Sequence, residues 1–251
     1  MIKERKLITK SDFQSILNKY YLGKIEQVKW QVKNKNLLIN FISLDKSVMG
    51  QVKCKDFPLE DVDLAIYETK KLDNLISVLS GEIWLELEKQ KEIVLKLKMG
   101  NNDFDIDFTL SDPLLIKDPG SVNFPDTWEI ECNLYPDNIS KILKAKNALP
   151  EINSLVIASE KNEDFGLVCK FIFGDDTNYD NKIIYQLSGN ITQENIEIRY
   201  DSDMLKSILT ANRDLESGIL KISKLGLMNL QFQNENITSN YYMVPQEGGV
   251  S

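Results

Sequence analysis

Two kinds of hydrophobic periodicity run along the chain, one with the 3.6-residue period of a helix and one with the two-residue period of a strand. Residues 61–79 contain both. The apolar run 62–67 predicts a short buried strand, and a one-sided apolar stripe after it predicts a helix over 68–80, formed by Leu72, Leu75, Ile76 and Leu79. Thr69 is expected to cap this helix by accepting a hydrogen bond from a first-turn N–H group.

The helical pattern occurs four times in the same form, an apolar residue followed by two polar residues and two apolar residues. The copies begin at Phe13, Leu72, Ile139 and Leu205. Any amphipathic helix fits one copy, so the argument depends on four copies in a matched order in a chain that otherwise reads as strands. They predict two copies of one unit, each with two helices and several strands. The helices are expected at 10–22, 68–80, 136–149 and 201–213.

The strands are predicted from alternation and from turn residues. In the first half we expect them at 24–33, 36–44, 47–55, 62–67, 82–88, 92–98 and 103–110. In the second half we expect them at 128–134, 154–160, 166–173, 182–188, 195–200, 217–223, 225–233 and 238–244.

Between the halves, residues 111–127 contain three prolines and a glycine, which do not fit inside a sheet. We therefore predict an N-terminal domain at 1–110, a connector at 111–127 and a C-terminal domain at 128–251. The connector keeps apolar residues, which favours an interaction surface, and a purely structural linker is the alternative. These residues are Leu114, Leu115, Ile116, Val122 and Phe124.

The composition argues against several classes of function. The 251 residues include no histidine, no glycine-rich phosphate loop and no Cys/His zinc spacing, so we expect no enzymatic activity, no cofactor and no metal. The three cysteines are widely spaced and are expected to be reduced thiols packed in strands. No apolar run approaches the roughly 20 residues of a membrane span, and the basic N-terminus does not have the pattern of a secretory signal.

Two acidic clusters could suggest metal binding. Asp103, Asp105 and Asp107 alternate with apolar residues, which favours the solvated face of a strand. The stretch 176–180 resembles the start of a calcium loop, but position six of that loop is Asn181 and position twelve is Leu187. We interpret it as a hairpin turn.

The net charge of −8 is unevenly distributed. The four predicted helices sum to +3, so the rest of the chain sums to −11. Most helix acids lie in first turns, where they favour the helix dipole. The bodies of the helices are therefore basic and the strand-rich remainder is acidic. The helix cations are Lys10, Lys19, Lys70, Lys71, Lys141, Lys144, Lys146, Lys206 and Arg213.

Two stretches carry a resemblance to a known family. Residues 61–79 resemble the strand and second helix of the DNA sliding clamp of T-even-type phages. The end of the last predicted strand, Tyr241-Tyr242-Met243-Val244-Pro245, is similar to that of the eukaryotic and archaeal clamps. By architecture, the resemblance to a sliding clamp covers nearly the whole chain.

The resemblance implies an α+β chain with the DNA clamp fold, that is, two tandem domains each with two helices on antiparallel sheets. Three such chains would form a six-domain homotrimeric ring, joined head to tail through edge strands 103–110 and 182–188. The helix cations would face double-stranded DNA in the hole, with Lys141 and Lys144 as the strongest candidates. Contacts to phosphates of this kind are independent of base sequence.

The resemblance also implies partners. A short hydrophobic peptide would dock on Leu114, Leu115, Ile116, Tyr242, Met243, Val244 and Pro245. The partners would be a replicative DNA polymerase, which the clamp makes processive, a clamp loader and, in some phages, late-transcription proteins. The setting would be a phage replisome in the host-cell cytoplasm, with no membrane partner.

Two other interpretations stay open at this point. A non-enzymatic structural or assembly protein with duplicated β-rich domains would show neither DNA preference nor a trimeric ring. A monomeric, sequence-tolerant nucleic-acid-binding module would need aromatic residues interleaved with its basic face. The polar sides of the predicted helices carry few aromatics, which argues against the second interpretation.

Overall fold

The computed structural model describes residues 6–91, 93–120, 124–164, 166–174, 181–246 and 248. The chain forms two compact units. Unit 1 comprises the chain up to Ser43 together with Gly50–Gly120 and Glu235–Ser239. Unit 2 comprises Leu44–Met49, the chain from the connector to Asn234, and the residues from Asn240 onward. The predicted hairpin turn at 176–180 lies outside the described residues.

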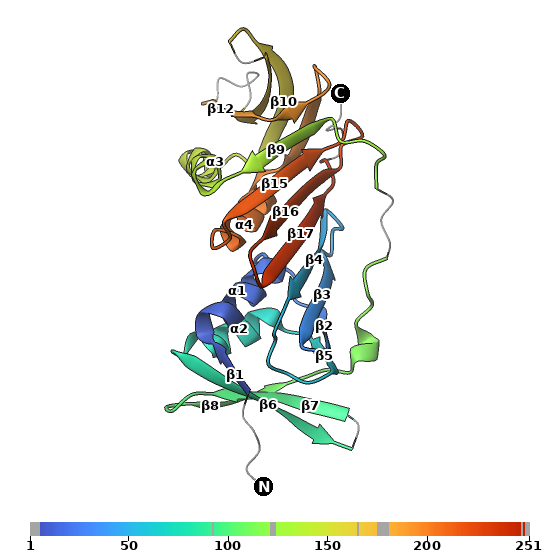
Figure 1. The fold of residues 1–251 in the computed structure, drawn as a ribbon, viewed down its shortest axis with the longest axis vertical. Coiled ribbons are helices and arrows are strands. Elements are labelled where there is room, and N and C mark those ends of the chain that lie inside the picture. The colour runs from blue at the N-terminus through green and yellow to red at the C-terminus, as the bar shows by residue number, and fades with distance from the viewer. Residues whose placement is uncertain are drawn as a thin grey trace. The chain divides into compact units, whose positions relative to one another are not determined.

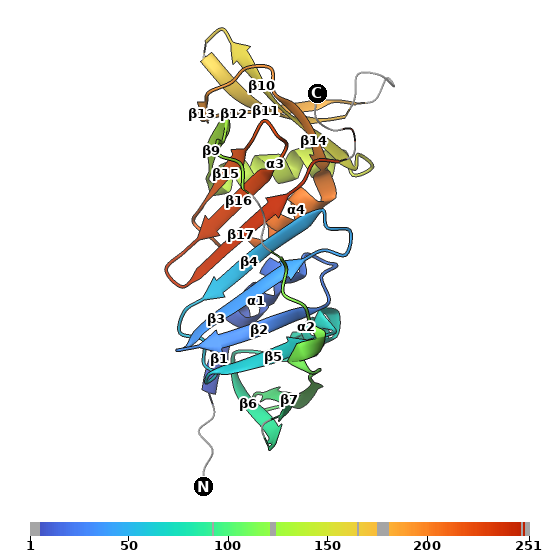
Figure 2. The same ribbon diagram turned by 90° about the vertical axis from the view of Figure 1, so that its right-hand side faces the viewer.

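Unit 1 contains two antiparallel sheets and two helices (Figure 1). One sheet has the strand order β1-β6-β7-β8, and the other strands follow the order β5-β2-β3-β4. The helices lie side by side on one face of β2, β3 and β5 (Figure 2). The elements are β1 (Lys6–Thr9), α1 (Lys10–Tyr21), β2 (Val28–Lys33), β3 (Asn36–Ile42), β4 (Val48–Cys54), β5 (Val62–Ile66), α2 (Thr69–Ser77), β6 (Glu82–Gln90), β7 (Ile93–Gly100), β8 (Asp105–Thr109) and the 3-10 turn η1 (Pro113–Leu115).

Unit 2 repeats this arrangement, with strand orders β9-β15-β16-β17 and β14-β10-β11-β12. A short strand β13 is added beside β9. The two units therefore share a topology, in which β17 corresponds to β8 and β12 to β4. The elements are β9 (Ile130–Leu134), α3 (Pro136–Ala148), β10 (Ser154–Asn162), β11 (Gly166–Phe173), β12 (Ile183–Ser188), β13 (Asn190–Ile191), β14 (Glu197–Asp201), α4 (Ser202–Ala211), β15 (Ser217–Ile222), β16 (Met228–Gln233) and β17 (Ile237–Met243).

The repeated apolar pattern faces the core in all four helices, as predicted. In α1, α3 and α4 every apolar position of the pattern is buried, and in α2 only Leu75 is half-exposed. The stripes are buried because each helix covers a sheet with one face. The strands alternate in the same way, and β2, β3 and β15 each bury every second residue.

Some helix N-termini are capped by a neighbouring residue, and others by a residue far away in the sequence. Thr9 caps α1, because its Oγ1 accepts the Asp12 N–H at 3.1 Å. The prediction that Thr69 caps α2 is wrong. The Thr69 hydroxyl instead donates to the Glu26 carbonyl at 2.9 Å, and the Glu26 carboxylate accepts the Lys70 N–H at 3.0 Å. A residue 44 positions away in sequence thus supplies the anion at this helix N-terminus.

Each unit has an aromatic core. In unit 1 the Trp30 ring is fully buried, and Phe13, Tyr20 and Phe57 meet it edge-on at centroid distances of 5.7–6.4 Å. In unit 2 Phe232 and Tyr241 form a similar pair at 6.2 Å. All three cysteines are buried free thiols in strands β4, β9 and β11, as predicted.

Two predicted edge strands lie at sheet edges. β8 is the last strand of the first sheet of unit 1, and β12 is the last strand of one sheet of unit 2. Within β8 the side chains of Asp105 and Asp107 are exposed, whereas Ile106 and Phe108 are buried, which confirms the alternation. Phe104 departs from it, because it lies in the turn before the strand and is 48% exposed.

Candidate functional site

Five of the predicted helix cations have exposed side chains. Three of them, Lys70, Lys144 and Arg213, make no ion pair with another described residue, although Arg213 lies just beyond the end of α4. The other two are paired on their own helices. Lys71 Nζ lies 3.2 Å from the Glu68 carboxylate, and Lys141 Nζ lies 2.6 Å from the Asp137 carboxylate.

The ion pair of Lys141 reduces the charge that it presents to solvent. The hydrogen bond to Asp137 is the main reason that the pKa of Lys141 lies above its ordinary value. Lys144 is one turn further along α3 and has no such partner within the described chain. Lys144 therefore presents more unneutralised positive charge to solvent than Lys141 does.

Lys10 and Lys206 are half-exposed. Lys10 Nζ donates to the carbonyl oxygen of Ser77 at 2.8 Å and so joins the start of α1 to the end of α2. A carbonyl at a helix C-terminus is a favourable partner for a cation. Lys10 therefore has a structural role in addition to its charge.

The prediction that the helix cations are exposed is wrong for Lys19 and Lys146, because neither side chain faces solvent. Lys19 is fully buried and its Nζ donates to Ser15 Oγ at 2.8 Å. Lys146 is 2% exposed, and its Nζ contacts the Pro150 carbonyl and the Asp203 carboxylate, both at 3.0 Å. It joins the end of α3 to the start of α4. Neither ammonium group is available to a ligand on the surface of the chain.

The apolar residues of the connector divide into two groups. Leu114 and Leu115 are in η1 and are 89% and 68% exposed, which suits a partner surface. Ile116 is 7% exposed and belongs to the core, so it is not available to a peptide. Val122 lies outside the described residues.

The end of the chain presents a second apolar surface, within unit 2. Val244 is 45% exposed and Tyr242 and Pro245 are half-exposed, but Met243 points into the core and is 1% exposed. A ring from the connector, Phe124, packs against Tyr242 at a centroid distance of 4.8 Å.

Leu44 is a candidate that the sequence did not suggest. Its side chain is fully exposed, and its segment runs beside the end of β17, where the Val244 N–H donates to the Ser47 carbonyl at 3.1 Å. The available signal was a leucine next to two charged residues, Asp45 and Lys46, in a turn, where an apolar side chain stays exposed to solvent.

The described residues contain no group of three or more His, Cys, Asp or Glu side chains that could hold a metal ion. None of the described helices has the length and apolar character that a bilayer span requires.

No protein-family model matches the chain, and no curated protein matches its sequence. Several solved structures do resemble it. The structure of the C-terminal region of FEN-1 bound to A. fulgidus PCNA gives a TM-score of 0.76 at 13% identity, over 96% of this chain and 98% of that one. The PCNA2-PCNA3 complex from Sulfolobus tokodaii gives 0.74 at 10% identity, over 97% and 99%. The proliferating cellular nuclear antigen from Entamoeba histolytica gives a TM-score of 0.73 at 12% identity, over 96% of this chain and 98% of that one.

The fold therefore belongs to the α+β class, with helices packed on antiparallel sheets. More particularly, it is the fold of PCNA-type DNA clamps, and the likeness extends over nearly the whole of both chains. This confirms the fold that the sequence predicted.

Proposed function

We propose that this protein is a sliding clamp that encircles double-stranded DNA and holds a replicative polymerase on it. The observation that carries the proposal is the whole-chain likeness to clamp structures, with 96–97% of this chain covered. The cations on its helices support it, because exposed lysines bind phosphates without reading bases. Such contacts permit movement along the duplex.

In this proposal three chains close a ring head to tail, with β8 of one chain beside β12 of the next. Among the described strands, each of these two ends a sheet, so each has one edge that no described strand pairs. Pairing would satisfy the backbone N–H and C=O groups of these edges and would bury the exposed side chain of Ile184 in β12. The cations that we assign to the DNA face are Lys10, Lys70, Lys71, Lys141, Lys144, Lys206 and Arg213.

Partners would bind through the exposed apolar residues. One solved relative is a PCNA with the C-terminal region of FEN-1 bound to it, which supports a peptide-binding role for this chain. We assign the contact to Leu44, Leu114, Leu115, Phe124, Tyr242, Val244 and Pro245. From the resemblance of 61–79 we further propose a phage replisome in the host cytoplasm, with a polymerase, a clamp loader and late-transcription proteins as partners.

A threading experiment tests this function. Purified protein at high concentration is mixed with linear duplex DNA whose ends are open, the ends are then blocked with streptavidin, and retained protein is measured after a salt wash. We expect retention when the ends are blocked after mixing and none when they are blocked before. Topological binding survives salt that screens individual phosphate contacts.

Lys141→Glu/Lys144→Glu should lower the retained fraction roughly tenfold, because the charge that replaces each lysine repels phosphate. The control Lys89→Glu/Lys161→Glu makes the same change in net charge on strands β6 and β10 and should thread normally. Retention that is independent of free ends, or equal loss in both variants, would contradict the proposal.

A further inference from the structure

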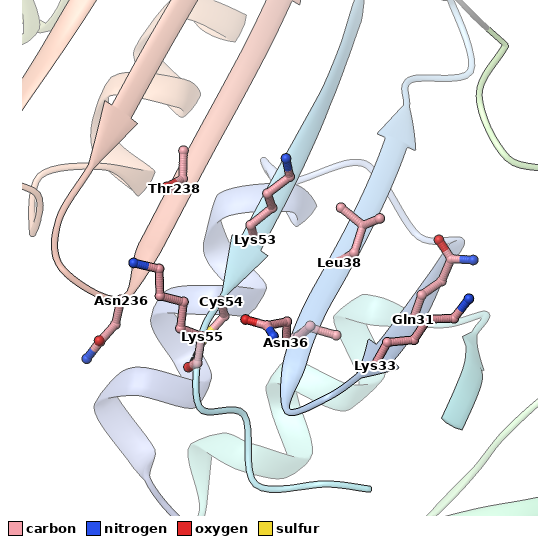
Figure 3. A pocket seen from close by; sticks show the side chains of 10 residues that line it. Gln31, Lys33, Asn36, Leu38, Lys53, Cys54, Lys55, Asn236 and Thr238 are labelled. Atoms are coloured by element: carbon pink, nitrogen blue, oxygen red, sulfur yellow. Dashed lines mark hydrogen bonds between the residues drawn. The ribbon is translucent and has the colours of Figure 1, made fainter. Parts of the chain in front are cut away.

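A depression of about 420 Å³ lies on the solvent side of unit 1, at the turn end of the β2–β3 hairpin (Figure 3). It is lined by side chains of β2, β3 and β4, of Lys55 just after β4, and of the segment that begins β17. Three of the lining residues are lysines, and no carboxylate is among the described side chains that line it.

The depression is bordered by Lys33 at the end of β2 and by Lys53 and Lys55 at the end of β4. All three side chains are exposed. Lys55 Nζ donates only to a backbone carbonyl, that of Glu235, at 3.2 Å. Lys33 and Lys53 have no hydrogen-bond or ion-pair partner within the described chain. Three ammonium groups border this depression and no carboxylate is among its described lining side chains, so an anion placed in it would be attracted.

The frame of the depression is fixed by backbone hydrogen bonds. The Lys55 N–H donates to the Asn236 carbonyl at 2.9 Å, and the Phe57 N–H donates to the Lys35 carbonyl at 2.8 Å. The hairpin turn adds a third bond, because the Asn34 N–H donates to the Asp61 carboxylate at 2.8 Å. The site therefore needs little rearrangement of the backbone on binding, which lowers the entropic cost.

We propose that this depression binds a short acidic peptide segment of a partner protein, separately from the DNA face and from the apolar peptide surface. Leu38 supplies an apolar patch beside these charges. The volume of the depression suits a few side chains rather than a duplex. Two or three carboxylates match the three ammonium groups.

Fluorescence anisotropy with the full-length protein tests this inference. The probe is a fluorescein-labelled Glu-Leu-Glu-Glu-Leu-Glu peptide, and the comparison peptide has Gln at each Glu position. We expect saturable binding of the acidic peptide only. Lys33→Gln/Lys53→Gln should weaken binding roughly fivefold, in keeping with two partly exposed charge contacts. Lys33→Arg/Lys53→Arg should keep it.

The matched control Lys89→Gln/Lys161→Gln removes the same charge elsewhere and should bind the peptide like the unaltered protein. Equal affinity for the Gln peptide, or unchanged affinity in Lys33→Gln/Lys53→Gln, would overturn the proposal. So would a duplex oligonucleotide that binds through these two lysines in place of the peptide. DNA threading is measured on the same variant and should be unchanged, which separates this inference from the clamp function.

Discussion

Glu129 shows how one buried carboxylate can hold a loop in place. Its side chain is 6% exposed and accepts hydrogen bonds from the Thr127 hydroxyl and, at 2.6 Å, from the Lys224 N–H. Burial acts to raise the pKa of the Glu129 carboxyl, but these hydrogen bonds outweigh it and the pKa lies below its ordinary value. The folded state therefore favours the ionised form of the Glu129 carboxyl.

Glu129→Gln should lower the free energy of unfolding by about 1–3 kcal/mol near neutral pH, because a charged acceptor is lost. A depressed pKa contributes stability above the unfolded-state value, and this contribution is lost as pH falls through the folded-state value. The loss should therefore shrink in acid. Urea unfolding at neutral and acidic pH measures it, with exposed Glu194→Gln as the control. A pH-independent difference would contradict this account.

At the scale of single residues, the candidate site was only partly predictable from the sequence. Exposure of Lys70, Lys141 and Lys144 follows from helical spacing alone. Lys146 falls one heptad after Ile139, and its charge is balanced by Asp203 on another helix, which no local pattern reveals. Lys19 is buried although it is charged, with its ammonium group bonded to Ser15. The burial of Lys146 depends on its tertiary contact with Asp203.

At the scale of elements, the four helices and most strands were predictable because their apolar periods are regular. Two short strands were missed, β1 with four residues and β13 with two, since such runs carry little periodicity. The cap of α2 was also missed, because its anion comes from Glu26 in a distant loop. By contrast, α4 is capped locally: the Asp201 carboxylate accepts the N–H groups of Asp203 and Met204 at 2.9 and 2.8 Å.

Asp201→Ala should destabilise unit 2 by about 0.5–2 kcal/mol, since two N–H groups of the first turn of α4 lose their acceptor. The matched control is Glu68→Ala at the N-cap of α2, where the side chain makes no capping bond. That change should stay within about 0.5 kcal/mol. Thermal unfolding compares the two variants, and equal losses would show that the cap of α4 contributes little.

At the scale of the whole molecule, the fold followed from the internal repeat. A pattern found four times required two copies of one unit, and the shared strand order of the two units confirms that duplication. Assembly has no such signature in the sequence, because pairing between chains uses backbone groups that every residue carries. The trimer is therefore a prediction that rests on the two edge strands and on the clamp fold.

Light scattering after gel filtration, over a dilution series, tests the trimer. The chain has a mass of 28.8 kDa, and we expect a species of three times that mass that dissociates on dilution. Each contact between chains would be a single strand pair, so dissociation should occur without unfolding, which circular dichroism of the diluted sample can establish. A strict monomer at the highest concentration would remove the ring and the threading mechanism with it.

In the proposed ring, the two edge strands β8 and β12 would also allow a defective variant to inactivate normal chains. In a head-to-tail ring each subunit uses both edges, so a subunit with one edge blocked still joins a neighbour but stops closure. One such subunit would inactivate two normal ones. A variant of this kind would act dominantly when it is produced beside the normal chain, in contrast to a variant that merely fails to fold.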